Sequence, residues 1–195
     1  MSENQQYQQS RPRYRLKKTV VMVGMMGAGK TAVGRALAAR LAVPFVDSDA
    51  EIETAANMTV PEIFERDGEP FFRAKETQVI SRLLDEARGV LSTGGGAFLA
   101  EVNRANITAR GVSVWLNADL DLLWQRVRHK DTRPLLRTAN PRATLAEIYA
   151  ARVPLYALAD VSVVSLPDLS IEQMVDRVIA TLVADRPDVL ELEHA

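Results

Sequence analysis

The sequence contains no cysteine and has two histidines among its 195 residues. Disulfide bonds, thiolate catalysis and cysteine-based metal sites are therefore excluded, and His129 and His194 are too few for a histidine-rich metal site. No apolar run approaches the roughly 20 residues of a membrane-spanning helix. The polar first residues also lack the apolar segment of a secretory signal. We therefore expect a cytoplasmic protein with no membrane partner.

An excess of charge of one sign is also missing. The chain has 24 Lys and Arg residues against 25 Asp and Glu residues, so its formal net charge is −1. A surface for nucleic acid is not expected from this balance, and each functional basic residue must act locally. The length fits a single domain, which we expect over residues 17–185, with tails at 1–16 and 186–195. We expect a monomer.

Short Val-rich runs alternate with helical patterns along the chain. The apolar runs are Thr19–Val23, Pro44–Val46, Gly89–Leu91, Val112–Leu116 and Val161–Val164. Runs of this kind are typical of strands buried on both faces. Residues 30–41 have helical spacing, and capping-box patterns predict helix starts at Thr59, Thr144 and Ser170. The alternation predicts an α/β fold, with a parallel sheet flanked by helices.

The first predicted strand leads directly into a glycine-rich motif. Its residues are Gly24-Met25-Met26-Gly27-Ala28-Gly29-Lys30-Thr31, which satisfy G-x-x-x-x-G-K-[ST]. Glycines let successive backbone N–H groups point at phosphate oxygens, and the following helix adds its positive end. Lys30 is placed to reach the β- and γ-phosphates, and the Thr31 hydroxyl to ligate Mg²⁺. The motif predicts a bound nucleotide without specifying a reaction.

Acids and glycines follow the next two predicted strands. Asp47 and Asp49 come after the second strand, and alternation along an extended segment would place them on the same side. One could help hold Mg²⁺ while the other accepts a proton, although Asp49 could instead cap a helix. The triplet Gly94-Gly95-Gly96 follows the third strand. It allows a ligand to approach the backbone closely, with a tight turn as the alternative.

Three arginines stand out by their context. Arg73 and Arg152 lie among apolar residues, where a guanidinium needs a partner. Either could clamp a carboxylate or simply form an ion pair. Arg133 lies in a basic break between two helical patterns, at residues 129–137. That break suits a mobile flap whose arginine stabilises transferred charge, or else a solvated loop.

Taken in chain order, these motifs resemble the shikimate kinase family between about Lys18 and Ala184. They are G-x-x-G-x-G-K-T with Gly34-Arg35, Asp47-Ser48-Asp49, Phe72-Arg73 with Glu76, Gly94-Gly95-Gly96, Arg133-Pro134-Leu135-Leu136 and Arg152-x-Pro154-Leu155-Tyr156. The resemblance implies a five-stranded parallel sheet of the nucleoside-monophosphate-kinase type, a substrate-binding region at about 48–80 and a lid at about 129–141. It also implies that ATP and Mg²⁺ are used to phosphorylate the 3-hydroxyl of shikimate, in aromatic amino-acid biosynthesis.

The resemblance also implies a role for each matching residue. Asp49 would hold and deprotonate the hydroxyl, and Lys30 and Arg133 would flank the transferring phosphoryl group. The other implied roles are substrate binding by Arg73, Arg152 and the backbone of Gly95 and Gly96, Mg²⁺ binding by Thr31 and Asp47, nucleotide binding by Gly27, Ala28, Gly29, Lys30, Thr31, Ala32 and Arg133, and packing on adenine by Arg126.

Two features depart from the family pattern, and two other functions compete with it. Ala32 replaces a hydroxyl residue that often follows the Mg²⁺ ligand, and the N-terminal tail is longer than the family needs. A kinase of another polyhydroxy acid, such as gluconate, would share the phosphate loop but has less need of paired Arg73 and Arg152. A nucleotide-binding regulator without activity could keep the loop, but the presence of Asp49 and Arg133 argues against it.

Overall fold

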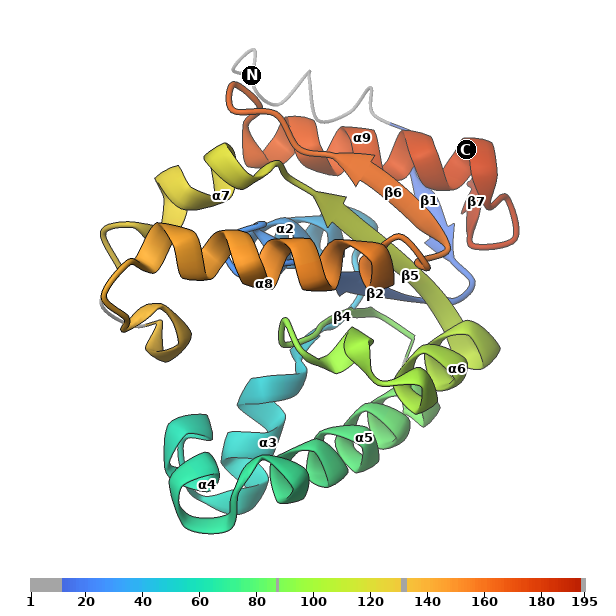
Figure 1. The fold of residues 1–195 in the computed structure, drawn as a ribbon. Helices are drawn as coiled ribbons and strands as arrows, with labels where there is room; N and C mark the ends of the chain where they lie inside the picture. The colour runs from blue at the N-terminus through green and yellow to red at the C-terminus, as the bar shows by residue number, and fades with distance from the viewer. Residues whose placement is uncertain (1–11, 87, 131–132, 194–195) are drawn as a thin grey trace, which may run out of the picture.

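A five-stranded parallel sheet forms the centre of the molecule (Figure 1). The structure is a computed structural model and describes residues 12–86, 88–130 and 133–193. The strand order is β3-β4-β2-β5-β6, and the bounds are Thr19–Val23 for β2, Phe45–Asp47 for β3, Val90–Ser92 for β4, Gly111–Asn117 for β5 and Val161–Val164 for β6. Each predicted run overlaps one of these strands, so the predicted α/β fold with a parallel sheet is confirmed.

The middle of the sheet is buried on both faces. Strand β2 lies between β4 and β5, and Val21 pairs with Leu91 on one side and Ser113 on the other. All five residues of β2 are buried. A Val-rich run without polar alternation folds in this way because helices cover both faces of a parallel sheet.

Helices pack on both faces of the sheet (Figure 1). Helices α2 (Lys30–Leu41) and α9 (Ile171–Asp185) lie together on one face, and α8 (Pro141–Tyr156) crosses the other. The remaining elements are α3 (Ser48–Ala56), α4 (Val60–Asp67), α5 (Glu69–Asp85), α6 (Glu101–Arg110), α7 (Leu120–Val127) and the 3₁₀ turns η1 (Ala97–Leu99) and η2 (Pro134–Leu136). Helices α3 and α4 and the start of α5 project beyond the sheet as an arm. No helix formed by the described residues could span a bilayer.

Two of the three predicted capping boxes are confirmed. Thr59 begins α4 and Ser170 begins α9, each with the reciprocal hydrogen bonds of the motif. The predicted start at Thr144 is wrong because α8 begins one turn earlier. Asn140 caps that helix by accepting from the N–H of Ala143, and a proline follows it at the first helical position. The helix therefore begins at the asparagine cap followed by proline and not at the predicted threonine cap.

Both ends of the described chain form strands, which corrects the expected tail boundaries. Strand β1 (Tyr14–Leu16) pairs antiparallel with β7 (Leu190–Leu192). Residues 14–16 and 190–192 were expected to belong to tails, because neither has the composition of a core strand. Each becomes ordered by pairing with a segment far away in the sequence, which composition does not reveal. Residues 1–11 and 194–195 of the expected tails lie outside the described residues.

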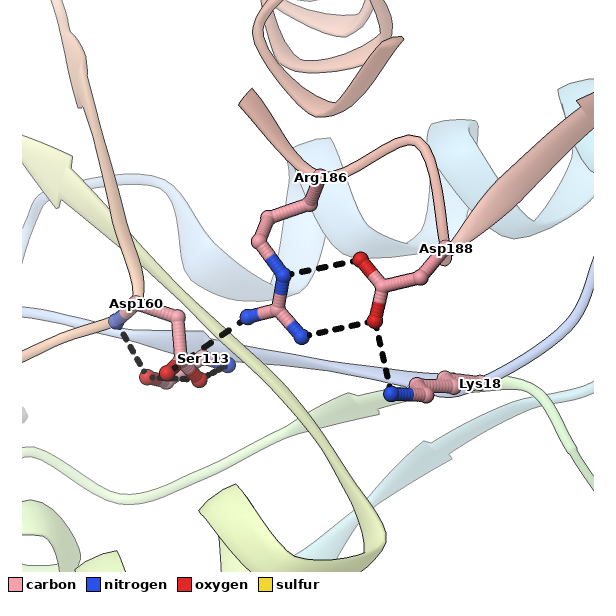
Figure 2. Close-up of polar contacts among 5 residues, drawn as sticks. All are labelled: Lys18, Ser113, Asp160, Arg186 and Asp188. Carbon is pink, nitrogen blue, oxygen red and sulfur yellow. Dashed lines mark hydrogen bonds and ion pairs between the residues drawn. The ribbon is translucent and has the colours of Figure 1, made fainter. Parts of the chain in front are cut away.

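A polar network ties these ends to the amino edge of the sheet, where the parallel strands begin (Figure 2). Asp188 accepts from Arg186 through both carboxylate oxygens, at 2.9 and 3.0 Å, and from Lys18 at 2.6 Å. Arg186 also lies 3.6 Å from Asp160. Asp160 in turn accepts from the backbone N–H and the hydroxyl of Ser113, at 2.8 and 3.0 Å. The network therefore connects the residues just before β2 and β6 with strand β5 and the segment after α9.

Candidate active site

A cavity of about 550 Å³ opens at the carboxyl edge of the sheet, where the parallel strands end. Ligands of open α/β sheets bind at this edge. The lining residues are Met26, Gly27, Ala28, Gly29, Lys30, Thr31, Ala32, Val33, Asp47, Asp49, Thr93, Gly94, Gly95, Arg126, Lys130, Arg133, Ser165, Leu169, Ile171 and Met174. The cavity thus brings the glycine-rich motif, both acids, Gly95, Arg126 and Arg133 together. Gly96, the last residue of the triplet, is not in this lining, and neither are Arg73 and Arg152, which lie beside the triplet.

The glycine-rich loop joins β2 to α2 in a conformation that requires glycine. Gly27 and Gly29 have φ angles of 80° and 94°, in the region that other residues rarely adopt. A Cβ on Gly27 would also lie 2.7 Å from a methyl group of Val127. Gly29 is the N-cap of α2, so the free N–H groups of the first helical turn lie beside the cavity. Such a helix start attracts phosphate.

Two basic side chains contact the carbonyl groups of this loop. Lys30 Nζ donates to the carbonyl oxygens of Gly24 and Met25, both at 2.9 Å. Arg126 donates to the carbonyls of Gly27 and Ala28 at 3.1 and 3.3 Å. Arg126 therefore braces the loop as well as lining the cavity, and its contact with adenine stays a prediction.

The electrostatic setting of Lys30 is unusual for a lysine. Burial lowers its pKa to about 8, and the nearby positive charge of Arg133 acts in the same direction. The two acids partly offset this effect. A ligand with several negative charges would offset the repulsion between Lys30 and Arg133. It would therefore favour the protonated form of Lys30. The cavity is therefore suited to a polyphosphate.

Asp47 ends β3 and caps α3. Its Oδ1 accepts from the backbone N–H groups of Asp49 and Ala50, at 2.9 and 3.2 Å. The helix cap considered for Asp49 is thus formed by Asp47 instead. Its other oxygen, Oδ2, lies 3.4 Å from the Thr31 hydroxyl. Both acids line the cavity, but not through strand alternation, because Ser48 already begins α3.

The oxygens of Thr31 and Asp47 fit a hydrated Mg²⁺ ion that arrives with a nucleotide. Magnesium prefers oxygen ligands and is usually held by one or two protein groups together with phosphates and water. Across the described ranges, no group of three or more His, Cys, Asp or Glu residues could hold a metal ion by itself. This pair of oxygens therefore suits an ion that the protein holds together with nucleotide phosphates better than an ion held by protein groups alone.

Asp49 faces the glycine triplet with one oxygen unsatisfied. A Cβ on Gly94 would lie 2.8 Å from each carboxylate oxygen of Asp49, so only glycine leaves room there. Oδ1 of Asp49 is buried and has no hydrogen-bond partner within the part of the chain that the structure describes. Burial and the neighbouring Asp47 raise the pKa of Asp49 to about 6. A carboxylate tuned in this way can accept a proton near neutral pH.

Arg73 and Glu76 form an ion pair beside the triplet. Arg73 lies on α5 and donates to Glu76 Oε1 at 2.8 Å, and a Cβ on Gly96 would overlap its guanidinium. The Glu76 side chain is 1% exposed, and burial raises its pKa although Arg73 opposes the effect. Sequence reasoning assigned Glu76 no role. The sequence feature that could have revealed the ion pair is the three-residue spacing between Arg73 and Glu76, which places the two side chains on one helix face.

Arg152 approaches the triplet from α8. A Cβ on Gly95 would lie 3.2 Å from Arg152 Nη1. The buried Tyr156, one turn further along α8, donates to the Gly95 carbonyl at 2.5 Å. Sequence reasoning used Tyr156 only as part of a motif and missed this contact. The two arginines therefore reach neighbouring glycines from different helices.

Arg133 lies within the segment after α7, at about 129–141, that is predicted to be a lid. It lines the cavity and lies close enough to Lys30 to affect the lysine's pKa. Its Nε is buried and lacks a hydrogen-bond partner among the described residues. Asp131 and Thr132, which belong to the predicted lid, lie outside those residues. Closure of this segment stays a prediction.

Comparison with known proteins identifies the family. The family model described as shikimate kinase matches residues 26–183. The chain belongs to the shikimate kinase family. A shikimate kinase of Ruegeria pomeroyi is 75% identical over 177 residues, covering 91% of this chain and 90% of the relative. A shikimate kinase of Cereibacter sphaeroides is 67% identical over 180 residues, covering 92% of this chain and 89% of the relative.

Solved structures of shikimate kinases share the fold. The enzyme of Acinetobacter baumannii in complex with shikimate is 36% identical, with a TM-score of 0.81 over 87% of this chain and 94% of that one. A gluconokinase of Sinorhizobium meliloti is 19% identical, with a TM-score of 0.59, and shows a similar fold only. The five-stranded kinase fold implied by the resemblance is therefore confirmed.

Proposed function

We propose that this chain transfers the γ-phosphoryl group of ATP to the 3-hydroxyl of shikimate, giving shikimate 3-phosphate and ADP in aromatic amino-acid biosynthesis. One observation carries the proposal. The Asp49 carboxylate, with its pKa near 6, faces a glycine triplet that Arg73 and Arg152 approach, and it shares a cavity with Lys30. An acid, two arginines and close backbone suit a small hydroxylated carboxylate.

In this reaction Asp49 serves as the general base. The 3-oxygen attacks the γ-phosphorus while its proton passes to the Asp49 carboxylate, and the bond to the β–γ bridging oxygen breaks to release ADP. A carboxyl with a pKa of about 6 is mostly ionised at pH 7 and is a stronger base than an ordinary aspartate. Lys30 and Arg133 stabilise the charge that moves from the acceptor to the leaving oxygen.

The remaining side chains hold the reactants. Arg73 and Arg152 bind the substrate carboxylate, and the backbone of Gly95 and Gly96 lines the substrate pocket. Thr31 and Asp47 would hold Mg²⁺, which neutralises phosphate charge when bound. The segment at 129–141 acts as the lid that excludes water.

The setting of the reaction belongs to the same proposal. The chain acts in the cytoplasm as a monomer, with ATP and shikimate as partners and without nucleic acid. The near-zero net charge supports the last point.

The proposal is tested by measuring ADP release from Mg-ATP by the purified protein with shikimate, gluconate or no acceptor. We expect stimulation by shikimate alone, with phosphate appearing on its 3-hydroxyl. Stimulation by gluconate alone would instead make the protein a kinase of a different polyhydroxy acid. Nucleotide binding without stimulation by either acid would favour a regulator.

A further inference from the structure

Tyr156 is the last residue of α8 and is completely buried. Its ring stacks on Trp115 of β5, with 6.2 Å between the ring centroids and 29° between the ring planes. A phenylalanine would pack equally well against an indole, so packing alone does not account for a hydroxyl at this depth. A buried tyrosine hydroxyl needs hydrogen-bond partners, and the identity of those partners shows what the oxygen does.

The Tyr156 hydroxyl joins two parts of the candidate site. Its hydrogen is donated to the Gly95 carbonyl at 2.5 Å. Its oxygen also lies beside the Arg152 guanidinium, which comes from one helical turn earlier: a Cβ on Gly95 would lie 3.7 Å from the Tyr156 hydroxyl and 3.2 Å from Arg152 Nη1. Burial raises the pKa of Tyr156, so the hydroxyl stays protonated and keeps the hydrogen that it donates. One oxygen atom thus links a guanidinium to the glycine triplet.

We propose that Tyr156 is a positioning residue for the acceptor substrate, because its hydroxyl fixes both the Arg152 guanidinium and the peptide that follows Gly95. The inference rests on the proposed function, in which Arg152 binds the substrate carboxylate and the triplet lines its pocket. Tyr156 itself touches no reactant in this scheme. It acts through the two groups that do.

The contact with Gly95 has a directional consequence. In a trans peptide the C=O of one residue and the N–H of the next point in opposite directions, and no peptide bond of the described chain is cis. A hydroxyl that holds the Gly95 carbonyl therefore also aims the N–H of Gly96, on the far side of the same peptide. Glycine peptides rotate easily because no Cβ restricts them, so this triplet needs an external contact to hold one orientation.

The contact with Arg152 restricts a second flexible group. An arginine side chain has several rotatable bonds, and ordering it on binding costs conformational entropy. Because Tyr156 holds the guanidinium beside Gly95 before substrate arrives, much of that ordering is already complete in the free protein. Loss of the hydroxyl should consequently weaken binding of the acceptor and leave the nucleotide loop unaffected.

The experiment compares the wild-type chain with Tyr156→Phe and with the control Tyr149→Phe. Tyr149 lies on the same helix, half-buried against the core, so its variant makes the same chemical change outside the proposed site. Steady-state kinetics give kcat and the KM values for shikimate and ATP, at a temperature well below the unfolding midpoints of all three proteins. We expect Tyr156→Phe to raise the KM for shikimate about tenfold, the size of one lost hydrogen bond to a charged group. The KM for ATP should change less than about twofold in either variant.

A double-mutant cycle keeps the test sharp if the phenylalanine variant is also less stable. In an Arg152→Ala background the hydroxyl has lost one of its partners, so adding Tyr156→Phe should raise the KM for shikimate by a smaller factor than in the wild type. Equal factors in both backgrounds, an unchanged KM for shikimate, or equal rises for shikimate and ATP would each overturn the positioning role. If shikimate does not stimulate ADP release by the wild-type protein, the proposed function itself is refuted. This outcome is seen before any variant is made.

Discussion

The charged residues at the two edges of the central sheet differ in how fully they are hydrogen-bonded. At the amino edge, the charged residues drawn in Figure 2 are all paired: Asp188 with Arg186 and Lys18, and Asp160 with Arg186 and Ser113. At the carboxyl edge, buried polar atoms of Asp49, Glu76 and Arg133 have no hydrogen-bond partner within the described residues. Both edges carry polar residues, so they differ in whether the polar atoms are hydrogen-bonded and not in the kinds of residue present.

The pKa shifts follow the same division. Hydrogen bonds from Arg186 and Lys18 hold the pKa of Asp188 well below its usual range. At the other edge, burial raises the pKa of Asp49 to about 6 and lowers that of Lys30 to about 8. Hydrogen-bonded ion pairs stabilise the fold, whereas buried charged groups with an unsatisfied atom cost stability and can bind a ligand. Changes at the two edges should therefore have opposite consequences for stability and activity.

The largest effect should come from Asp49→Asn at the carboxyl edge. Removing the proposed base should lower kcat by about 1000-fold, while ATP binding measured by calorimetry stays near the wild-type value. Because the folded-state pKa of Asp49 lies above its usual value of 3.8, ionisation costs stability once the pH rises through about 6. The neutral variant should therefore unfold at an equal or higher temperature than the wild type at pH 8. Near-normal turnover would remove Asp49 as the base, and a lower unfolding temperature would contradict the cost assigned to its charge.

The pH dependence of activity should reveal both shifted groups of this edge. With shikimate varied, kcat/KM should fall about tenfold per unit below pH 6, because Asp49 must be ionised. With ATP varied, kcat/KM should fall above about pH 8, because Lys30 must be protonated in the free enzyme. Saturation with ATP should move this upper limb to higher pH, since phosphate favours the ammonium. The acidic limb should be missing from the residual activity of Asp49→Asn, and its persistence there would assign it to another group.

At the amino edge, Asp160→Ala should reduce stability without reducing activity. The backbone N–H of Ser113 would lose its acceptor inside the fold, which costs about 1–3 kcal/mol. Chemical denaturation at pH 7 measures the free energy of unfolding, and steady-state assays check that kcat and both KM values are unchanged. Ser113→Ala keeps the bond from its own N–H but removes the hydroxyl oxygen that accepts from the backbone N–H of Asp160 at 2.8 Å, so it should cost a similar amount. A loss of turnover in folded Asp160→Ala would show that the two edges are coupled.

The smallest effect should come from Asp188→Asn. The carboxylate has three hydrogen bonds, but its side chain is 44% exposed, so solvent screens the interaction and the loss should be below about 1 kcal/mol. Because the folded-state pKa lies below the ordinary value, this contribution is present above about pH 4 and declines as the pH falls further. Denaturation curves of wild type and variant should therefore converge in acid and in high salt. A difference that persists in high salt would indicate a packing role instead.

Local sequence signals predicted much of the fold and of the site. The phosphate loop and the caps at Thr59 and Ser170 depend on residues close together in the chain, so the sequence was sufficient for them. The pairing of β1 with β7 could not be predicted, because it depends on residues more than 170 positions apart.

Contacts between distant residues of the site could not be predicted from the sequence either. The hydrogen bond from Tyr156 to Gly95 spans 61 positions, and no local pattern at either residue predicts it. Asp49 was predicted as the acid facing the substrate, but its raised pKa depends on its burial beside the glycine triplet in the folded chain. Sequence motifs identified which residues matter, and the fold supplies the environment that tunes them.

The short β1–β7 sheet also determines how the chain would respond to a pulling force. Tyr14 pairs with Leu192 in antiparallel register, and the next bond outward joins the N–H of Glu193 to the carbonyl of Arg13. Tension applied at these two ends would load the bonds of the ladder one after another, as a zipper opens, because the ladder bonds lie perpendicular to the strands. This sheet would thus separate at low force, and the load would reach the five-stranded core only after Lys18 and Arg186 had released Asp188.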